Sequence, residues 1–180
     1  MLTSLARTLL VGARRSLVPP GVAGPVQAPA PRPRRAGRVT GPPPGSSYPG
    51  DHDGPVDAHW APTPDGRPDP GEVVWTWVPY EEDHSRGKDR PVLLVGRDGP
   101  WLLGVPLTSK DHDRDAEQER RAGREWVDVG PGAWDARRRP SEAAIHRVVR
   151  VDPEAIRREG AVLDRARFDE VAAALRARHG

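Results

Sequence analysis

The chain of 180 residues contains no cysteine and no long apolar run. Without cysteine there is no disulfide framework, no cysteine-ligated zinc or iron–sulfur site and no thiol nucleophile. No apolar stretch approaches the ~20 residues that a membrane-spanning helix needs. We therefore expect a protein without a membrane anchor, and the lack of cysteine fits the reducing environment of the cytoplasm.

Proline and charge are unevenly distributed along the chain. Fifteen of the 22 prolines lie in residues 1–70, and residues 1–40 carry seven arginines and no acidic residue. Such a segment buries too little apolar surface to offset the entropy of ordering. We predict a disordered tail over 1–47, an extended lead-in arm over 48–70 and one globular domain over 71–180. The arginine-rich start also fits a transit peptide or an upstream start codon, so whether 1–47 belongs to the mature protein stays open.

The first half of the globular domain has the pattern of short strands. Three segments rich in β-branched and aromatic residues are bounded by glycine, proline or charged turns: Glu72–Val78, Pro91–Gly96 and Trp101–Leu107. The Arg97-Asp98-Gly99 turn between the second and third segments predicts a hairpin. Gly104 and Pro106 predict a bulge or an edge near the end of the third strand.

The second half predicts two further strands and a helix. Glu125–Val129 alternates as a short strand. Glu142–Val151 is predicted as one apolar strand, although Ala143 and Ala144 also allow a helix. Pro153–Glu159 forms one or two helical turns after the capping residue Asp152. Asp164–Arg178 is the helix, with one apolar stripe of Phe168, Val171, Ala172 and Leu175. This order predicts a mainly β fold, a small β-barrel with helical additions.

The sequence offers no convincing metal or cofactor site. Asp111, Asp113 and Asp115 have the spacing of a calcium loop, but alanines stand where the loop needs glycine and glutamate. The six histidines include no pair with the spacing of a zinc motif, and no phosphate-binding glycine loop is present. We therefore predict a site without metal or cofactor.

Two strand ends carry residues suited to phosphate. Arg90 lies just before the second strand, and Thr108 and Ser109 follow the third. If these strands form a hairpin, Arg90 and Thr108 lie roughly opposite each other. A guanidinium fork binds phosphate oxygens, and a hydroxyl adds a further donor. A surface ion pair of Arg90 with Asp89 is the plain structural alternative.

Such a pair can cleave RNA without a metal ion. The 2′-hydroxyl attacks the neighbouring phosphodiester, fixed donors stabilise the developing charge, and a side chain removes the proton. Glu81, Glu82 and His84 precede Arg90 and are the candidate proton acceptors. Histidine is the side chain whose ordinary pKa lies nearest neutrality.

At these positions the chain resembles the MazF/PemK family of toxin–antitoxin ribonucleases. The resemblance covers about residues 70–178, and four stretches carry it: PGEVVWTWVPYEEDHSRGKDRPVLLVGRD from residue 70, VPLTSKD from residue 105, SEAAIHRVVRVDPEAI from residue 141 and GAVLDRARFDEVAAALR from residue 160. It implies an SH3-like barrel with a C-terminal helix, a homodimer, metal-independent cleavage of single-stranded RNA, and neutralisation by an antitoxin protein.

The resemblance also assigns roles to residues. Arg90 matches the family's catalytic arginine, and Thr108 matches its catalytic threonine, with Ser109 beside it. The family often has a Glu-Gln pair a few residues before the arginine, whereas this chain has the sequence His84-Ser85-Arg86. The candidates for the base are therefore His84, Glu82 and Glu81, in that order.

Aromatic and basic residues near these positions predict contacts with RNA. Single-stranded bases stack on aromatic rings, and cations follow the phosphates. The candidates are Trp77 and Tyr80 for the bases, and Arg86, Lys88, Arg120, Arg121 and Arg124 for the phosphates. The alternative function is a non-catalytic SH3-like module that binds a nucleic acid or a protein such as a gyrase. A pure binder would tolerate alanine at both Arg90 and Thr108.

Overall fold

The computed structural model describes residues 48–109, 121 and 123–180. The predicted tail over 1–47, the calcium-like aspartates and Arg120 lie outside these residues. In chain order the elements are β1 (Glu72–Pro79), β2 (Gly87–Asp98), β3 (Trp101–Thr108), β4 (Trp126–Gly130), β5 (Ser141–Ala144), β6 (Val149–Val151), a 3₁₀ turn (Pro153–Ala155), β7 (Arg158–Val162) and α2 (Arg165–His179).

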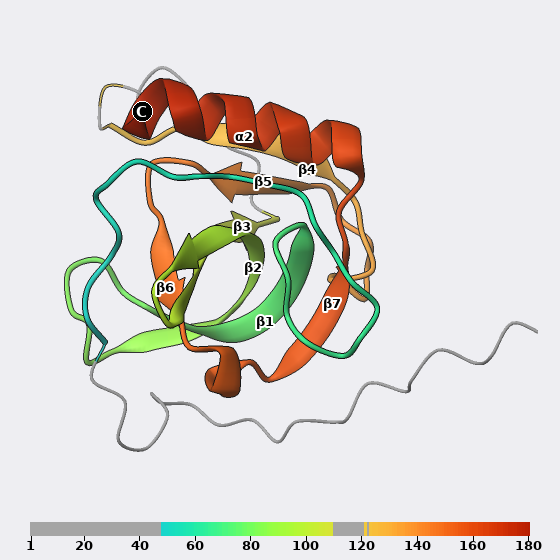
Figure 1. Ribbon diagram of the computed structural model, residues 1–180, viewed down its shortest axis with the longest axis horizontal. Coiled ribbons are helices and arrows are strands. Elements are labelled where there is room, and N and C mark those ends of the chain that lie inside the picture. Colours follow the sequence, from blue (N-terminus) through green and yellow to red (C-terminus); the bar gives the residue numbers. More distant parts are fainter. Residues whose placement is uncertain (1–47, 110–120, 122) are drawn as a thin grey trace, which may run out of the picture. The chain divides into compact units, whose positions relative to one another are not determined.

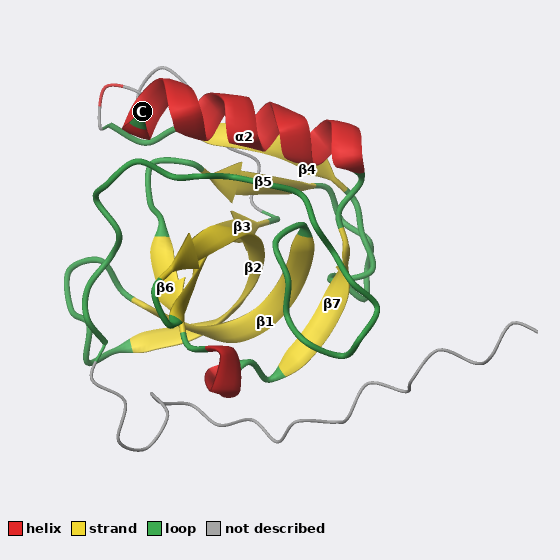
Figure 2. Ribbon diagram, in the orientation of Figure 1, coloured by secondary structure: helices red, strands yellow, loops and turns green. Residues whose placement is uncertain are grey.

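The described strands form one antiparallel sheet in the order β4-β5-β3-β2-β1-β7, with β6 paired to β3 away from this path. The sheet curls on itself as a half-barrel, and α2 lies across one side next to β4 and β5 (Figures 1 and 2). The prediction of a mainly β fold with a C-terminal helix is confirmed. Among the described residues, no helix has the length and apolar character needed to cross a membrane.

The hairpin of β2 and β3 is confirmed. Gly99 turns the chain with a φ of 58°, a left-handed conformation that glycine adopts without a steric cost. The register pairs Asp98 with Trp101 at the turn and Val92 with Pro106 at the far end. The irregularity lies between Leu94 and Gly96 on β2, so the bulge predicted near the end of the third strand was placed on the wrong strand.

The two strands separate beyond Val92 and Pro106. The start of β2 continues along β1, where Arg90 pairs with Thr76, while the end of β3 pairs with β5, where Thr108 faces Glu142. Pro91 and Pro106 have no N–H to donate to a ladder at this point. Beyond this point, β2 and β3 therefore pair with different strands and no longer with each other.

Two expectations for the second half of the domain were wrong. Glu142–Val151 is not one strand, because β5 and β6 are separated by a turn in which the Arg147 N–H donates to the Ala144 carbonyl at 3.2 Å. The apolar pattern hid this turn, since Ile145 and Val148 within it are buried as well. The sequence after the 3₁₀ turn forms β7 on the edge of β1 rather than more helix.

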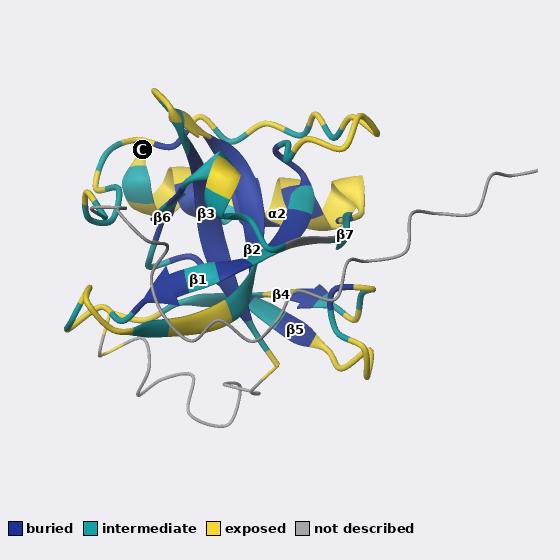
Figure 3. Cartoon of the chain, turned by 90° about the horizontal axis from the view of Figure 1, so that it is seen from below, coloured by how far each residue is buried: buried dark blue, intermediate teal, exposed yellow. Residues whose placement is uncertain are grey.

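Helix α2 closes the larger of two cores. Its expected stripe of Phe168, Val171, Ala172 and Leu175 is buried, and Asp164 caps its start by accepting from the Ala166 N–H at 3.0 Å. This core lies between the helix and the sheet and includes Leu93, Val105 and Leu107. A smaller core inside the curled sheet contains Val74, Val78, Val92, Leu94, Leu102, Val149 and Val151. Figure 3 shows the central strands as the buried part of the sheet.

Residues 48–70 contain no helix or strand and lie against the domain. Val56 is buried in the larger core, and the Trp60 indole N–H donates to the Leu163 carbonyl at 3.1 Å. The His52 N–H donates to the Val148 carbonyl at 2.8 Å. The boundary at residue 70 stays a prediction, but this segment packs as part of the same body of structure.

Candidate functional site

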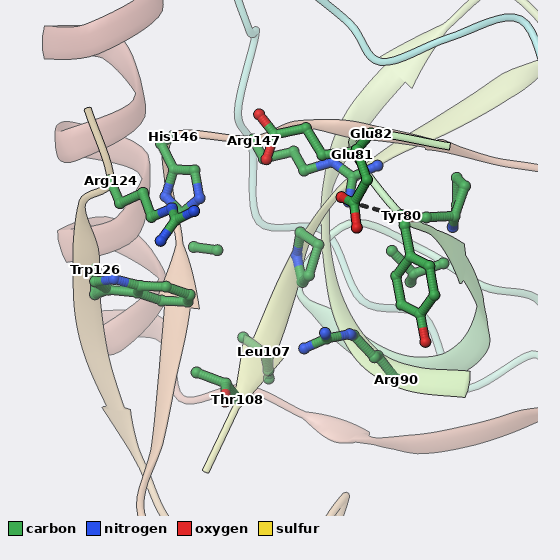
Figure 4. A pocket seen from close by; sticks show the side chains of 14 residues that line it. Tyr80, Glu81, Glu82, Arg90, Leu107, Thr108, Arg124, Trp126, His146 and Arg147 are labelled. Atoms are coloured by element: carbon green, nitrogen blue, oxygen red, sulfur yellow. Dashed lines mark hydrogen bonds between the residues drawn. The ribbon is translucent and has the colours of Figure 1, made fainter. Parts of the chain in front are cut away.

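A pocket of about 400 Å³ opens where β2 and β3 part. Its lining combines apolar residues, among them Val78 of the smaller core, with charged ones. The residues that line it are Val78, Pro79, Tyr80, Glu81, Glu82, Arg90, Pro106, Leu107, Thr108, Arg124, Trp126, Ala144, His146 and Arg147 (Figure 4). Three guanidiniums and two carboxylates therefore surround one cavity.

Arg90 enters the pocket from the start of β2. Its guanidinium points toward the end of β3 that carries Leu107 and Thr108 (Figure 4). Burial, followed by the neighbouring charge of Arg147, lowers the pKa of Arg90, while Tyr80 opposes this shift. The ion pair with Asp89 does not form, because Asp89 pairs with Arg157 at 2.7 Å. An anion bound in the pocket would therefore stabilise the charged form of Arg90, which burial and the charge of Arg147 disfavour.

Thr108 reaches the same pocket from the end of β3. The last pair of the hairpin joins Val92 to Pro106, so Arg90 and Thr108 stand at matching positions two residues further along their strands. Ser109 follows in an exposed position and does not line the pocket. The structure thus brings together Arg90 and Thr108 but leaves Ser109 outside.

Arg147 supplies a second guanidinium, from the turn between β5 and β6. Its Nε and Nη2 donate to the carboxylate of Asp51 at 2.6 and 3.2 Å, and its Nη1 donates to the Pro79 carbonyl at 2.9 Å. The side chain is only 13% exposed. A side-on pair with a carboxylate and a third bond to the backbone hold this cation in one orientation.

His146, from the same turn, forms another wall together with Trp126. The two rings meet edge to face with centroids 5.1 Å apart, and the His146 Nδ1 lies 3.1–3.2 Å from the backbone N and O of Glu125. Burial is the main cause that lowers the pKa of His146, with smaller effects from Arg178 and Arg124, while the backbone hydrogen bond with Glu125 and then the charge of Glu81 oppose the shift. The lowered pKa favours the neutral ring, and none of the hydrogen bonds among the described residues uses its Nε2.

The first-ranked candidate base lies elsewhere. His84 is exposed on the loop between β1 and β2, where its ring meets Tyr48 edge to face at 5.0 Å, and it does not line the pocket. Glu81 and Glu82 of the same loop do line it. A role for His84 stays a prediction, but the structure offers the two carboxylates and His146 as nearer proton acceptors.

Of the predicted RNA contacts that the structure describes, Tyr80 and Arg124 alone line the pocket. Arg86 lies outside it with its guanidinium 5.9 Å from the centroid of the Tyr80 ring. Lys88 is exposed, and its pKa is lowered first by the charge of Arg90 and then by burial. Trp77 packs over Gly87, where any added side chain would collide with the indole. Arg121 is exposed and also lies outside the pocket.

A family model described as the PemK-like, MazF-like toxin of type II toxin–antitoxin systems matches residues 69–178, more than half of the chain. The chain belongs to this family. No curated protein matches it. Among solved structures it is similar to a crystal structure of MazE-MazF (Form-II) from Deinococcus radiodurans, with 17% identity and a TM-score of 0.43, over 63% of this chain and 96% of that chain.

The match to the PemK/MazF family begins just before β1 and ends within α2. It includes every residue that lines the pocket, but it leaves out the segment from 48 to 68, in which Asp51 lies. The resemblance found in the sequence is therefore confirmed at the level of the family.

Sequence reasoning missed His146, Arg147 and Trp126 of this PemK/MazF-like pocket. The first two lie inside a run that was interpreted as an uninterrupted strand, in which an outward histidine and arginine have no special meaning. One signal was available: His146-Arg147 is the only polar pair inside the apolar stretch from 143 to 149. Two adjacent polar residues break the continuous apolar run that a fully buried strand would show.

The described part of the chain contains no group of three or more histidine, aspartate or glutamate side chains arranged to hold a metal ion. The pocket is lined by three guanidiniums, two carboxylates and one imidazole. These groups can bind an anion and move a proton.

Proposed function

We propose that this chain is a toxin-type endoribonuclease that cleaves single-stranded RNA without a metal ion. The 2′-hydroxyl attacks the adjacent phosphorus, and the products are a 2′,3′-cyclic phosphate and a 5′-hydroxyl. The observation that carries the proposal is the presence of Arg90 and Thr108, from two strands that part at this point, at one pocket of nucleotide scale. Membership in the PemK/MazF toxin family supports it.

The first task of the site is to stabilise charge on phosphorus. As the 2′-oxygen attacks, negative charge builds on the phosphoryl oxygens, and the Arg90 fork and the Thr108 hydroxyl donate to them. The pocket partly excludes water from Arg90, so its charge acts through a less polar medium than bulk solvent. A fixed donor of this kind contributes roughly 10²–10³-fold to the rate.

The second task is to remove the 2′ proton. We assign it to His146, because it borders the pocket and because the tautomer whose Nδ1 donates to the Glu125 carbonyl at 3.1 Å leaves Nε2 able to accept a proton. The lowered pKa of His146 favours this neutral form. The proton moves from the 2′-oxygen to Nε2, and the departing 5′-oxygen takes a proton from water. General base catalysis of this kind contributes roughly 10²–10⁴-fold.

Single-stranded RNA fits the walls of this pocket. Trp126 presents its ring from β4 and Tyr80 from the loop after β1, and unstacked bases bind such surfaces. In a duplex the bases are stacked and paired, so they cannot reach aromatic walls on two sides of one phosphate. We therefore expect cleavage in loops and single strands.

The family also supports the biological setting. In type II systems a protein antitoxin neutralises the toxin, so we propose an antitoxin partner, a homodimeric toxin and action on mRNA in the cytoplasm. The expected result of free toxin is inhibited translation and growth.

The test is to incubate purified protein with mixed single-stranded RNA in EDTA and to map the new ends. We expect cyclic phosphate and 5′-hydroxyl ends, and we expect Arg90→Ala to lose cleavage by about 10²-fold or more. Arg97→Ala is the matched control, because Arg97 lies on the same strand but is exposed and outside the pocket. Absence of cleavage by the unaltered protein, combined with tight binding to a protein target, would favour the non-catalytic module instead.

A further inference from the structure

An acidic residue outside the family match holds a basic residue of the pocket. Asp51 lies in the segment that precedes the match, and its carboxylate accepts from Nε and Nη2 of Arg147, 96 residues further along the chain. Tyr48 donates its hydroxyl to the same carboxylate. The Tyr48 hydroxyl thus helps to hold the Asp51 carboxylate, and the carboxylate holds the Arg147 guanidinium.

The backbone around Asp51 is anchored as well. Nη1 of Arg150 donates to the carbonyls of Gly50 and Asp51 at 3.0 and 2.8 Å, while the rest of its guanidinium pairs with Asp98 at 2.8 Å. The His52 N–H donates to the Val148 carbonyl. These bonds join residues 50–52 to β6 and to the end of β2, so Asp51 cannot move away from Arg147 without breaking them.

The anchor matters because the pocket brings like charges together. Arg147 and Arg90 both line it, and the charge of Arg147 is one cause of the lowered pKa of Arg90. Two guanidiniums that face one cavity repel each other, and a long arginine side chain has many other conformations to adopt. A side-on carboxylate counters this repulsion and selects one conformation.

We propose that the segment ahead of the family domain is a working part of the site: Asp51 positions Arg147 beside Arg90, so that the two guanidiniums together receive one phosphate. The side of the Arg147 guanidinium that faces the pocket binds the phosphate. Asp51 does not touch the substrate and acts only by holding Arg147 in place. This inference rests on the proposed function, because it assumes that the ligand of the pocket is an RNA phosphate.

The test is a double-mutant cycle in the full-length protein. The variants are Asp51→Asn, Arg147→Ala and the two combined, with Asp51→Glu as the conservative variant and Asp53→Asn as the control, since Asp53 is exposed in the same segment. Two quantities are measured: kcat and KM on cleavable RNA, and Kd for the same RNA with 2′-O-methyl groups, which cannot react. Thermal unfolding of each variant is recorded alongside.

We expect Asp51→Asn to weaken binding of the unreactive RNA by about tenfold, the effect of one misplaced charged contact. In the Arg147→Ala background the same change has no further effect. Asp51→Glu retains part of the affinity, and Asp53→Asn retains all of it. Equal losses from Asp51→Asn in both backgrounds, or a lower melting temperature with unchanged Kd and kcat, would show that Asp51 only stabilises the fold and would overturn the proposal.

Failure of this inference is distinct from failure of the proposed function. A protein that cleaves RNA but shows independent effects of Asp51 and Arg147 refutes the positioning role alone. A protein that binds the methylated RNA with the expected coupling, yet never cleaves its reactive counterpart, refutes the nuclease alone. A protein that binds neither RNA overturns both.

Discussion

Arg90 and Thr108 stand at matching positions two residues beyond the last cross-strand pair of their hairpin, that of Val92 with Pro106. Up to that pair, β2 and β3 hold each other at the spacing of a sheet; beyond it, β2 follows β1 and β3 follows β5. The Arg90 guanidinium and the Thr108 hydroxyl therefore continue from the paired strands of the hairpin and lie at the pocket between them. Sites on rigid strands keep their geometry better than sites on loops.

The hydroxyl of Thr108 can be tested separately from its volume. Thr108→Ser keeps the donor and is expected to retain cleavage within a few-fold, whereas Thr108→Val keeps the shape and loses about 10²-fold in kcat. Ser109→Ala is compared with them, and because Ser109 lies outside the pocket, its loss is expected to be the smaller one. Initial rates on one RNA oligonucleotide give the order. A larger loss from Ser109→Ala than from Thr108→Val would reverse the assignment.

The pH dependence of cleavage reports on His146. A general base works in its neutral form, and the pKa of His146 is lowered from its ordinary value of about 6.5 by burial. We therefore expect kcat to rise with pH along a limb that lies below about 6.5 and to be flat above it. His146→Asn should abolish the limb and most of the activity, while His84→Asn should leave the limb in place. A limb that disappears only in His84→Asn would restore His84 as the base.

The same lowered pKa makes folding depend on pH. The unfolded chain takes up a proton on His146 near its ordinary pKa, before the folded chain does, so the unfolded state gains relative stability as pH falls. The stability is fully present above about 6.5 and is lost as pH falls toward the folded pKa. We expect the unfolding free energy of the parent, relative to that of His146→Asn, to decrease as pH falls through that window. Urea titrations measure this difference in unfolding free energy. A difference that stays constant between about pH 5 and about pH 8 would contradict this expectation.

Salt should weaken RNA binding, because under the proposed function the guanidiniums of the pocket bind phosphate. Each contact with a single strand contributes about −0.7 to the slope of log affinity against log salt concentration. Arg124 is an exposed member of the pocket wall, so we expect Arg124→Ala to reduce the slope by about that amount. The control is Arg167→Ala on the exposed face of α2, which should leave the slope unchanged. Fluorescence anisotropy with 2′-O-methyl RNA at several salt concentrations measures both.

The stability of the domain should depend strongly on the apolar face of α2. Phe168 is 1% exposed and lies in the larger core, so Phe168→Ala is expected to cost about 3–5 kcal/mol of unfolding free energy. Asp164→Ala removes the cap that binds the Ala166 N–H and should cost about 1 kcal/mol. Ala173→Ser, on the exposed face, should stay within about 0.5 kcal/mol. Urea unfolding checks the order of the three.

The fold was predictable where local patterns are strong. The three early strands, the glycine turn and the stripe of α2 each follow from alternation, turn chemistry or helical spacing, and the structure has them. β7 was not predictable, because its sequence REGAV has little β character and its strand conformation comes from pairing with β1. Tertiary pairing overrode local propensity there.

The candidate site was predictable only in part, and for a similar reason. Counting residues from the turn of the hairpin placed Arg90 and Thr108 together, since register follows from sequence. Arg147, His146 and Trp126 reach the pocket through β4, β5 and the turn after β5, whose positions depend on pairing across the whole chain. Asp51 carries no local signal at all, because its partner lies 96 residues away.

The bonds between residues 50–52 and the turn around 147–150 also bear on when the protein becomes complete during synthesis. They join parts of the chain 96 to 100 residues apart, and contacts of such separation form only after the intervening chain has been made and its loop closed. A ribosome that has reached only β3 has already produced Arg90 and Thr108 but neither His146 nor Arg147. At that stage the nascent polypeptide therefore lacks these two side chains of the pocket. Under the proposed function, it cannot cleave the messenger that encodes it until the turn after β5 has been made.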